Sequence, residues 1–267
     1  MNLNTKSRSG ILLHPTALPG PYGIGDIGPY AYRFIDDLYD MGQSLWQILP
    51  IGPTDIYNSP YSSISTFAGN HLLISLDLLV EDDLLDPSIL GKHKKYNSNK
   101  ISFKDVINFK MPILMEASKN FTKNASSNMK KMFENFCTTN SYWLDDYSQY
   151  WALKIENKDT SWIDWEIKIV NNIDNIHYAK IIQFIFHDHW NRLHQYCRDK
   201  GIQIIGDMPI YVGYDSSDVY ANQDLFELNK SGKMIYQGGC PPCEYQDEGQ
   251  LWGNPLYDRE KHKETNF

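Results

Sequence analysis

The hydrophobic and polar positions of residues 29–50 predict a helix followed directly by a strand. Pro29 stands where proline opens helices, and apolar residues recur behind it at the spacing of one helical face. Gly42 then supplies a residue type that ends helices in the left-handed conformation. Residues 45–49 form a short apolar run, closed by Pro50, that predicts a buried strand. A helix, a glycine and a strand in this order make half of a β-α-β unit.

The same order of helix, glycine and strand recurs later in the chain. The stretch 178–199 has a wide apolar face at helical spacing, and Gly201 follows it. Residues 202–205 are rich in isoleucine and predict a parallel strand that is buried on both faces. The run breaks at Gly206 and Asp207. An acid at this place lies where α/β folds carry their chemistry, although it can also cap a turn or pair with a structural arginine.

The pattern predicts three consecutive parts of the chain. Residues 1–80 form a first segment of short strands, beginning at 11–13, among loops rich in glycine and proline. Residues 81–165 are rich in Lys, Asn and Ser and show helical stripes, which predicts a helical insertion, with Pro112 interrupting one stripe. Residues 166–267 return to the order of the first segment.

Composition and charge narrow the class of protein. The 267 residues are 42% hydrophobic and 22% charged, which is typical of a globular protein. A formal net charge of −8 argues against a nucleic-acid partner and against binding to an anionic membrane surface. No apolar run has the length of a signal-peptide core or a membrane span, which predicts a cytoplasmic protein.

Two short motifs resemble ligand-binding motifs, but the surrounding sequence does not favour either interpretation. The glycines within 23–28 have dinucleotide-fingerprint spacing, but the strand lies well upstream and Pro29 follows at once. Cys240 and Cys243 flank two prolines, and no second Cys/His pair lies at metal-like spacing. The two cysteines are therefore interpreted as reduced thiols in a rigid loop rather than as a zinc or redox site.

Residues 249–257 hold a dense set of amide, indole and glycine residues. Gln250 and Asn254 supply hydrogen-bond donors and acceptors, which suits sugar hydroxyls, and the ring of Trp252 suits the apolar face of a sugar. A glycine-rich turn with a buried tryptophan accounts for any one of these residues, but less well for the whole set. Aromatic residues reach 13% of the chain, which agrees with a sugar ligand but is weak evidence alone.

Several longer motifs follow one another between residues 13 and 255. They are LHPT-x-LPGPYGIGD at 13–26, LWQ-x-LP at 45–50, SPY at 59–61, FAGN at 67–70, GDMPIYV at 206–212 and GQLWGNP at 249–255. In these motifs and in their order the chain closely resembles the 4-alpha-glucanotransferases of glycoside hydrolase family 77, the amylomaltases or disproportionating enzymes.

The resemblance implies an α/β fold of the (β/α)8 TIM-barrel type with helical insertions, and a retaining double displacement on α-1,4-glucans such as maltooligosaccharides, starch and glycogen. By motif, Ser59 and Tyr61 match glucan contacts near the donor site. Asp207 matches an acid that orients an arginine beside the nucleophile. The family's glucan-binding loop is matched by Gln250, Trp252 and Asn254. The resemblance implies no metal and no organic cofactor.

The chain departs from the family pattern in two respects. The family's nucleophilic Asp, its acid/base Glu and a third Asp lie downstream of the last matched motif, and Phe267 precedes all three. The barrel is therefore expected to be truncated partway, which leaves an open sheet edge and an exposed core face. This chain alone is expected to be inactive, and either poorly soluble or dependent on the missing half. In addition, residues 243–246 read Cys-Glu-Tyr-Gln where the family usually has Asp, an aromatic residue and Ser, and Arg259 stands where Trp is common.

Two readings from different classes remain. In the first, the chain is the front part of an α-glucan transferase. In the second, it is a non-catalytic truncated barrel that at most binds glucan or a complementary fragment. The missing catalytic acids favour the second reading for the polypeptide taken alone, and an amylase-type hydrolase is less favoured because the motifs belong to the transferases.

Overall fold

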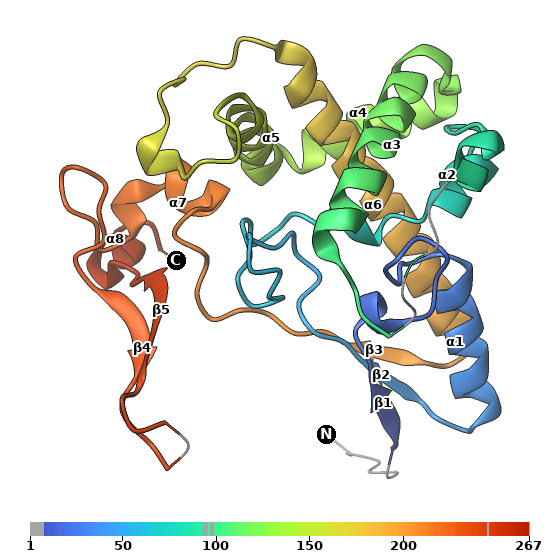
Figure 1. Ribbon diagram of the computed structural model, residues 1–267, viewed down its shortest axis with the longest axis horizontal. Helices are drawn as coiled ribbons and strands as arrows, with labels where there is room; N and C mark the ends of the chain where they lie inside the picture. The colour runs from blue at the N-terminus through green and yellow to red at the C-terminus, as the bar shows by residue number, and fades with distance from the viewer. Residues whose placement is uncertain (1–7, 93–95, 97–98, 245, 267) are drawn as a thin grey trace. The chain divides into compact units, whose positions relative to one another are not determined.

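A parallel sheet of three strands is accompanied by long helices, and a separate sheet of two strands lies in the later part of the chain (Figure 1). The structure is a computed structural model that describes residues 8–92, 96, 99–244 and 246–266. Its strands and α-helices are, in chain order, β1 Gly10–Leu12, α1 Pro29–Asp40, β2 Leu45–Gln47, α2 Leu76–Glu81, α3 Phe103–Asn124, α4 Ser127–Thr139, α5 Ser141–Glu156, α6 Ile173–Asp199, β3 Gln203–Ile205, α7 Ser217–Ala221, β4 Gln237–Cys240, β5 Gln250–Pro255 and α8 Arg259–Glu264.

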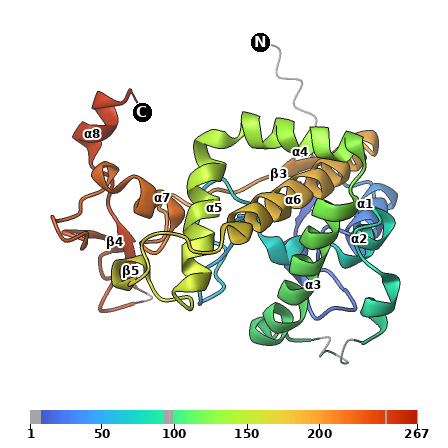
Figure 2. The same ribbon diagram turned by 90° about the horizontal axis from the view of Figure 1, so that it is seen from above.

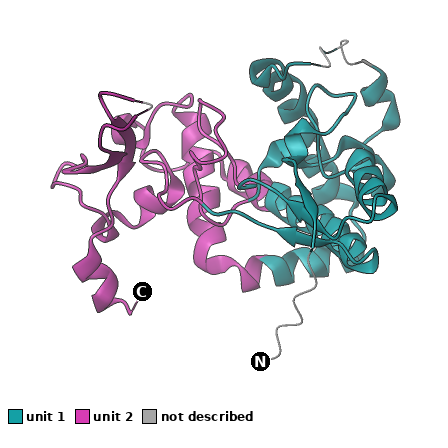
Figure 3. Ribbon diagram, turned by 90° about the horizontal axis from the view of Figure 1, so that it is seen from below, with its two compact units in different colours: residues 1–51, 69–136, 181–208 teal, residues 52–68, 137–180, 209–267 magenta. Residues whose placement is uncertain are grey.

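The chain divides into two compact units (Figure 3). Unit 1 consists of residues 1–51, 69–136 and 181–208, and unit 2 of residues 52–68, 137–180 and 209–267. Each unit is therefore built from segments that are distant in sequence. Helices α3, α4 and α5 occupy much of the stretch 81–165, but the division into 1–80, 81–165 and 166–267 stays a prediction. Among the described residues, no helix is both long and apolar enough to cross a membrane.

The local signals for helix ends are confirmed. Helix α1 begins at Pro29, and Gly42 just beyond its end has a φ of +68°. Helix α6 runs as one unbroken helix (Figure 2), and Gly201 after it has a φ of +71°. Left-handed φ values are accessible to glycine without a Cβ clash, so both helices end where the sequence predicts.

The expected interruption at Pro112 is wrong, because α3 continues through this residue from Phe103 to Asn124. A proline inside a helix removes one hydrogen bond and costs about 3 kcal/mol. Apolar side chains on both sides of the proline, Ile113 and Val106 among them, are buried in unit 1. Tertiary packing of this face thus outweighs the local preference, as it does for most helices in folded proteins.

The sheet has the order β1-β2-β3, and all of its pairs are parallel. In one register row, Trp46 is fully buried, its ring lies 5.2 Å from that of Phe34 on α1, and its indole donates to the carbonyl of Leu13 at 2.8 Å. In the next row, Leu12 and Ile205 are 57% and 41% exposed. These two rows point to opposite faces of the sheet, because side chains alternate along a strand.

The prediction that residues 202–205 are buried on both faces is therefore wrong for this strand. Strand β3 lies at the edge of the described sheet, and its burial alternates, with Ile204 less exposed than its neighbours. Burial on both faces requires a layer of structure on each side. Within unit 1, aromatic packing from α1 covers the face of Trp46.

A lysine is buried in unit 1. Lys110, on the apolar stripe of α3, is fully buried, and its ammonium donates to the carbonyls of Leu72 and Ile74 at 2.7 Å each. The carboxylate of Asp26 lies 3.6 Å from the same nitrogen and accepts a bond from the Gly28 amide. Burial lowers the pKa of Lys110, and burial raises the pKa of Asp26 to about 6 although the nearby lysine opposes this shift.

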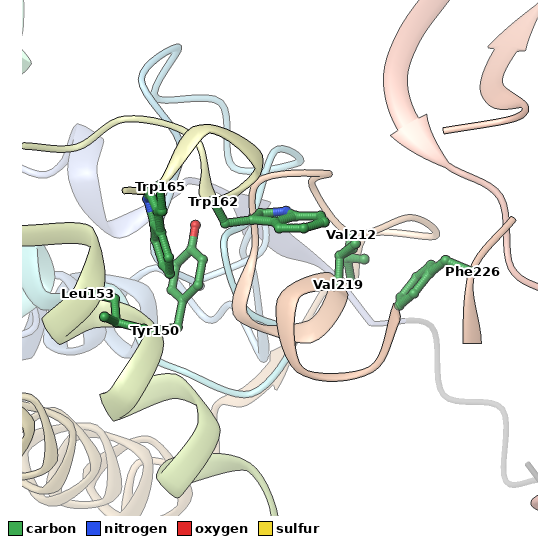
Figure 4. Packing of buried hydrophobic residues seen from close by; sticks show 7 residues of the cluster. All are labelled: Tyr150, Leu153, Trp162, Trp165, Val212, Val219 and Phe226. Carbon is green, nitrogen blue, oxygen red and sulfur yellow. The ribbon is translucent and has the colours of Figure 1, made fainter. Parts of the chain in front are cut away.

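The core of unit 2 is an aromatic cluster (Figure 4). The hydroxyl of Tyr150 donates to the carboxylate of Asp215 at 3.0 Å, and the indole of Trp162 donates to the carbonyl of Tyr214 at 2.7 Å. The polar edges of the rings are thus satisfied while their faces pack together. The buried members of the cluster are Tyr150, Leu153, Trp162, Trp165, Val212, Val219 and Phe226.

Candidate functional site

The antiparallel hairpin of β4 and β5 carries the tryptophan that the sequence singled out. Trp252 lies on β5, 47% exposed, and its ring centroid is 6.1 Å from that of Tyr211. Gly238 on β4 lies under both rings, because a Cβ at this position would contact Trp252 and Tyr211 at 3.4 Å. Tyr257 stacks on the ring of Tyr211 at 6.0 Å. The hairpin thus presents a half-exposed indole supported by half-buried aromatic rings.

A relay of hydrogen bonds orients the side chains next to this indole. The Trp252 Nε1 group donates to Gln250 Oε1 at 2.9 Å, and Gln250 Nε2 donates to Gln246 Oε1 at 2.6 Å. An indole N–H is a donor only, so the oxygen of Gln250 must face Trp252 and its amide nitrogen must face Gln246. The relay therefore leaves amide N–H groups of both glutamines to donate to a ligand.

The third residue of the predicted glucan loop, Asn254, has a different environment. It is half-buried, and its Nδ2 group donates to the carbonyl of Val212 at 2.7 Å. This bond joins the hairpin to the segment that contains Tyr211. Of the three predicted residues, Gln250 and Trp252 are thus bonded to each other at the surface, while Asn254 holds the hairpin against its neighbour.

Ser59 and Tyr61 lie on the loop 52–68 of unit 2. The Oγ atom of Ser59 accepts a bond from the backbone N–H of Tyr61 at 3.3 Å, and the tyrosine ring is half exposed. The backbone of Ser63 in the same loop accepts a bond from Gly213 at 3.1 Å. The loop is therefore tied to the chain segment between Asp207 and the hairpin, at a point close to Tyr211 in sequence.

Asp207 belongs to unit 1 and lies two residues beyond the end of β3, after Gly206. Its side chain is exposed, and Oδ1 accepts a bond from the backbone N–H of Met208 at 2.8 Å. Its position at the carboxyl end of a parallel strand is as predicted. The turn contact to Met208 agrees with the capping reading as well, so the arginine-orienting role stays a prediction.

His14 is a further candidate for the functional site. It belongs to the motif at residues 13–26, but the sequence alone assigns it no role. It follows β1 at the same carboxyl end of the sheet as Asp207, and its Nδ1 atom is buried without a partner among the described residues. Burial lowers the pKa of His14 to about 4, although a bond to the backbone of Leu49 opposes this shift. The ring is therefore neutral at pH 7. Its place just after a strand is the signal that could have identified it.

Two further groups of side chains, a cluster of two aspartates and a histidine and the four cysteines, contain atoms that metals bind. Asp82, Asp188 and His189 bring possible metal ligands within 4.8 Å of one another, but Arg192 already binds Asp82 at 2.6 Å and Asp188 at 3.0 Å. The guanidinium supplies the positive charge that these carboxylates need, so the arrangement is an ion-pair network.

All four cysteines are free thiols. Tyr245, one of the departures in the hairpin loop, lies outside the described residues.

The fold and the hairpin define an α/β protein with parallel strands and an aromatic-amide surface. A family model described as 4-alpha-glucanotransferase matches residues 13–267, and the chain belongs to this family, glycoside hydrolase family 77.

Named relatives agree with this assignment. The 4-alpha-glucanotransferase of Aquifex aeolicus is 41% identical, over 97% of this chain and 54% of its own length. That of Clostridium butyricum is 42% identical, over 96% of this chain and 54% of its own length. Among solved structures, the amylomaltase from Streptococcus agalactiae in complex with acarbose has a TM-score of 0.92 at 34% identity, over 98% of this chain and 55% of that one. The chain thus spans about half the length of the relatives that it matches.

Proposed function

We propose that this chain is part of a 4-alpha-glucanotransferase, which transfers a segment of an α-1,4-glucan to the 4-hydroxyl of another glucan or of glucose. The match to the family model over residues 13–267 carries the proposal. The exposed indole of Trp252 beside an oriented amide supports it, because this pairing suits a sugar ring and its hydroxyls. The streptococcal relative holds acarbose, a pseudo-oligosaccharide, which supports maltooligosaccharides, starch or glycogen as the substrate class.

We infer further that the sheet β1-β2-β3 is part of a (β/α)8 barrel interrupted by the helices of residues 81–165. Each neighbouring pair of strands is parallel, as a barrel of this type requires. His14 and Asp207 follow the carboxyl ends of β1 and β3, and barrel enzymes build their active sites at these ends.

The proposed chemistry is a retaining double displacement. A carboxylate attacks the anomeric carbon while a carboxylic acid protonates the leaving glucan oxygen, and a sugar hydroxyl, deprotonated by the same group, then displaces the enzyme carboxylate. In this scheme Asp207 orients an arginine beside the nucleophile and does not react itself. No residue of this chain is assigned as the nucleophile or as the acid/base.

The substrate contacts are proposed for the residues of unit 2. Trp252 stacks on a sugar face, and Gln250 donates to a hydroxyl oxygen through the N–H that its relay leaves available. Ser59 and Tyr61 contact the donor glucan from the loop 52–68. The amide nitrogen of Asn254 is engaged by the backbone, so its Oδ1 atom is the contact that we assign to the ligand.

Incubation with maltooligosaccharides tests the proposal. We expect the 267-residue chain to bind maltoheptaose in a calorimeter and to leave maltotriose unchanged in chromatography. Absence of maltoheptaose binding would contradict the substrate class. Glucose together with longer maltooligosaccharides would show that working acids exist within the chain, and the assignment of no nucleophile would then be wrong.

Substitution of Gln246 tests the relay beside Trp252. Gln246→Met removes the acceptor of the Gln250 amide at nearly constant side-chain length, and we expect the dissociation constant for maltoheptaose to rise about fivefold, which corresponds to the loss of about one hydrogen bond. Gln246→Glu keeps an acceptor oxygen and should bind within about twofold of the unmodified chain. The indole ¹H–¹⁵N resonance of Trp252 should shift in the methionine variant. Equal affinities of the two variants would count against the relay.

A further inference from the structure

The glucan contacts assigned to Ser59 and Tyr61 depend on the shape of residues 55–62, which we call the donor loop. The two ends of the donor loop are joined by a hydrogen bond from the backbone N–H of Asp55 to the carbonyl of Ser62 at 3.0 Å. A second bond, from the backbone N–H of Ser62 to the carbonyl of Ser59 at 3.0 Å, closes a turn that contains Tyr61. The donor loop is therefore a short closed structure rather than an open stretch of chain.

Asp55 fixes the first half of the donor loop through its side chain as well as its backbone. Its Oδ1 atom accepts a bond from the backbone N–H of Tyr57 at 2.9 Å, and its carbonyl accepts one from that of Asn58 at 3.0 Å. Asn58 has a φ of +57°, a left-handed value that asparagine adopts more readily than most residues. Its Nδ2 group donates to the carbonyl of Ile56 at 3.2 Å. The chain thus turns just before Ser59 because Asp55 and Asn58 hold this conformation.

The carboxylate of Asp55 also places the donor loop beside the core of unit 2. It is half-buried, and burial raises its pKa. The N–H groups of the donor loop oppose this shift, the carboxylate of Asp215 adds to it, and the ammonium of Lys154 opposes it. Asp215 pairs with Lys154 and also accepts bonds from the Tyr150 hydroxyl and the Trp162 backbone N–H, at 3.0 Å each. Asp55 therefore lies beside an ion pair that the aromatic cluster holds in place.

A glucan contact is stronger when the loop that makes it is already ordered. Ordering a loop on binding costs conformational entropy, and a loop held in its bound shape avoids this cost. The bond from the Tyr61 N–H to the Oγ atom of Ser59 orders the second half of the donor loop. Asp55 orders the first half, because its carboxylate is engaged by the backbone of the loop itself.

We propose that Asp55 is a positioning residue for the donor glucan, which holds the donor loop closed so that Ser59 and Tyr61 meet the substrate without reordering. The inference rests on the proposed function, because the contacts that Asp55 supports are those assigned there. Asp55 does not touch the glucan itself. Its removal therefore weakens binding only as long as Ser59 and Tyr61 are present to make their contacts.

Maltoheptaose affinity, measured by calorimetry on double-mutant cycles, tests this inference. Asp55→Ala should raise the dissociation constant about fivefold, because the N–H of Tyr57 loses its acceptor and the loop loosens. In Ser59→Ala/Tyr61→Ala the same change should alter the constant less than about twofold, because the contacts that it positions are already lost. In Trp252→Ala it should again cost about fivefold, because this ring lies on the hairpin and not on the donor loop.

Two variants control for loss of a capping bond and for side-chain chemistry. In unit 1, Asp86 accepts a bond from the backbone N–H of Ser88 at 2.7 Å, with the same sequence separation as the bond of Asp55. Asp86→Ala should leave the affinity unchanged. Asp55→Asn keeps an acceptor oxygen and should bind within about twofold of the unmodified chain. Thermal unfolding verifies that each variant is folded at the temperature of the binding measurement.

Asn58 supplies a test that leaves Asp55 in place. Asn58→Gly preserves the left-handed turn and should bind within about twofold of the unmodified chain. Asn58→Val puts a β-branched residue at a φ of +57°, which opens the turn, and should raise the dissociation constant about fivefold or more. Loss of affinity with valine but not with glycine would tie binding to the backbone conformation of the donor loop. Equal affinities of the two variants would count against the inference.

The outcomes that overturn this inference differ from those that overturn the proposed function. If Asp55→Ala binds maltoheptaose as tightly as Asp86→Ala, the inference is wrong and the proposed function stands. The same holds if Asp55→Ala weakens binding equally with and without Ser59 and Tyr61. If the unmodified chain binds no maltoheptaose, the proposed function fails and this inference fails with it.

Discussion

Lys110→Met is expected to lower the free energy of unfolding by about 4 kcal/mol, because it removes one partner of a buried ion pair. Methionine fills a similar volume but leaves the Asp26 carboxylate buried without its cation. The carbonyls of Leu72 and Ile74 also lose the donor that each accepts at 2.7 Å. Urea denaturation followed by far-UV circular dichroism measures the change.

Two variants serve as controls for this prediction. Lys119→Met replaces an exposed lysine of the same helix and should change stability by less than about 0.5 kcal/mol. Lys110→Met/Asp26→Asn should recover part of the loss, because the second change removes the unpaired carboxylate. If Lys110→Met unfolds at the same urea concentration as Lys119→Met, the buried lysine does not stabilise unit 1.

The stability of the chain relative to Asp26→Asn is expected to fall by about 3 kcal/mol between pH 3.5 and pH 7. The pKa of Asp26 is raised from 3.8 to about 6 in the folded chain, mainly by burial. A raised pKa means that the folded state holds its proton more tightly than the unfolded state does. The resulting stability is complete below pH 4 and is lost as the pH rises through 6.

Comparison with the asparagine variant isolates this one group, because all other titrating residues are common to both proteins. Urea denaturation at intervals of half a pH unit measures the difference. A difference that stays constant over this range would show that the carboxyl of Asp26 does not hold a raised pKa. A difference that grows with pH would mean that the attraction to Lys110 outweighs burial.

Local chemistry was enough to predict much of the fold. Pro29, Gly42 and Gly201 determine where helices begin and end, because their backbone preferences act within a few residues. The sequence also predicted strands at β1, β2 and β3, and the motifs within residues 13–255 predicted the family. The interruption at Pro112 and the two-sided burial of residues 202–205 were wrong, since both depend on what packs against the segment.

The candidate site also contains residues that the sequence predicts and residues whose role depends on tertiary contacts. Gln250 and Trp252 are two residues apart on one strand, so their hydrogen bond follows from local geometry once the strand forms. In the sequence Gln246 stands out only as a departure from the family pattern, because its role depends on closure of the hairpin. The sequence gives His14 no role, since its burial comes from contacts across the sheet.

The sequence by itself determined both ends of α1 and the end of α6, the strands of the parallel sheet and membership of the glucanotransferase family, because these depend on short-range preferences and on motif order. Only the tertiary structure decided that Lys110 is buried against Asp26, and that Phe67 meets Tyr142 at the surface. In each pair the residues are far apart in sequence. Their contact depends on the packing of whole elements, which no local pattern of residues contains.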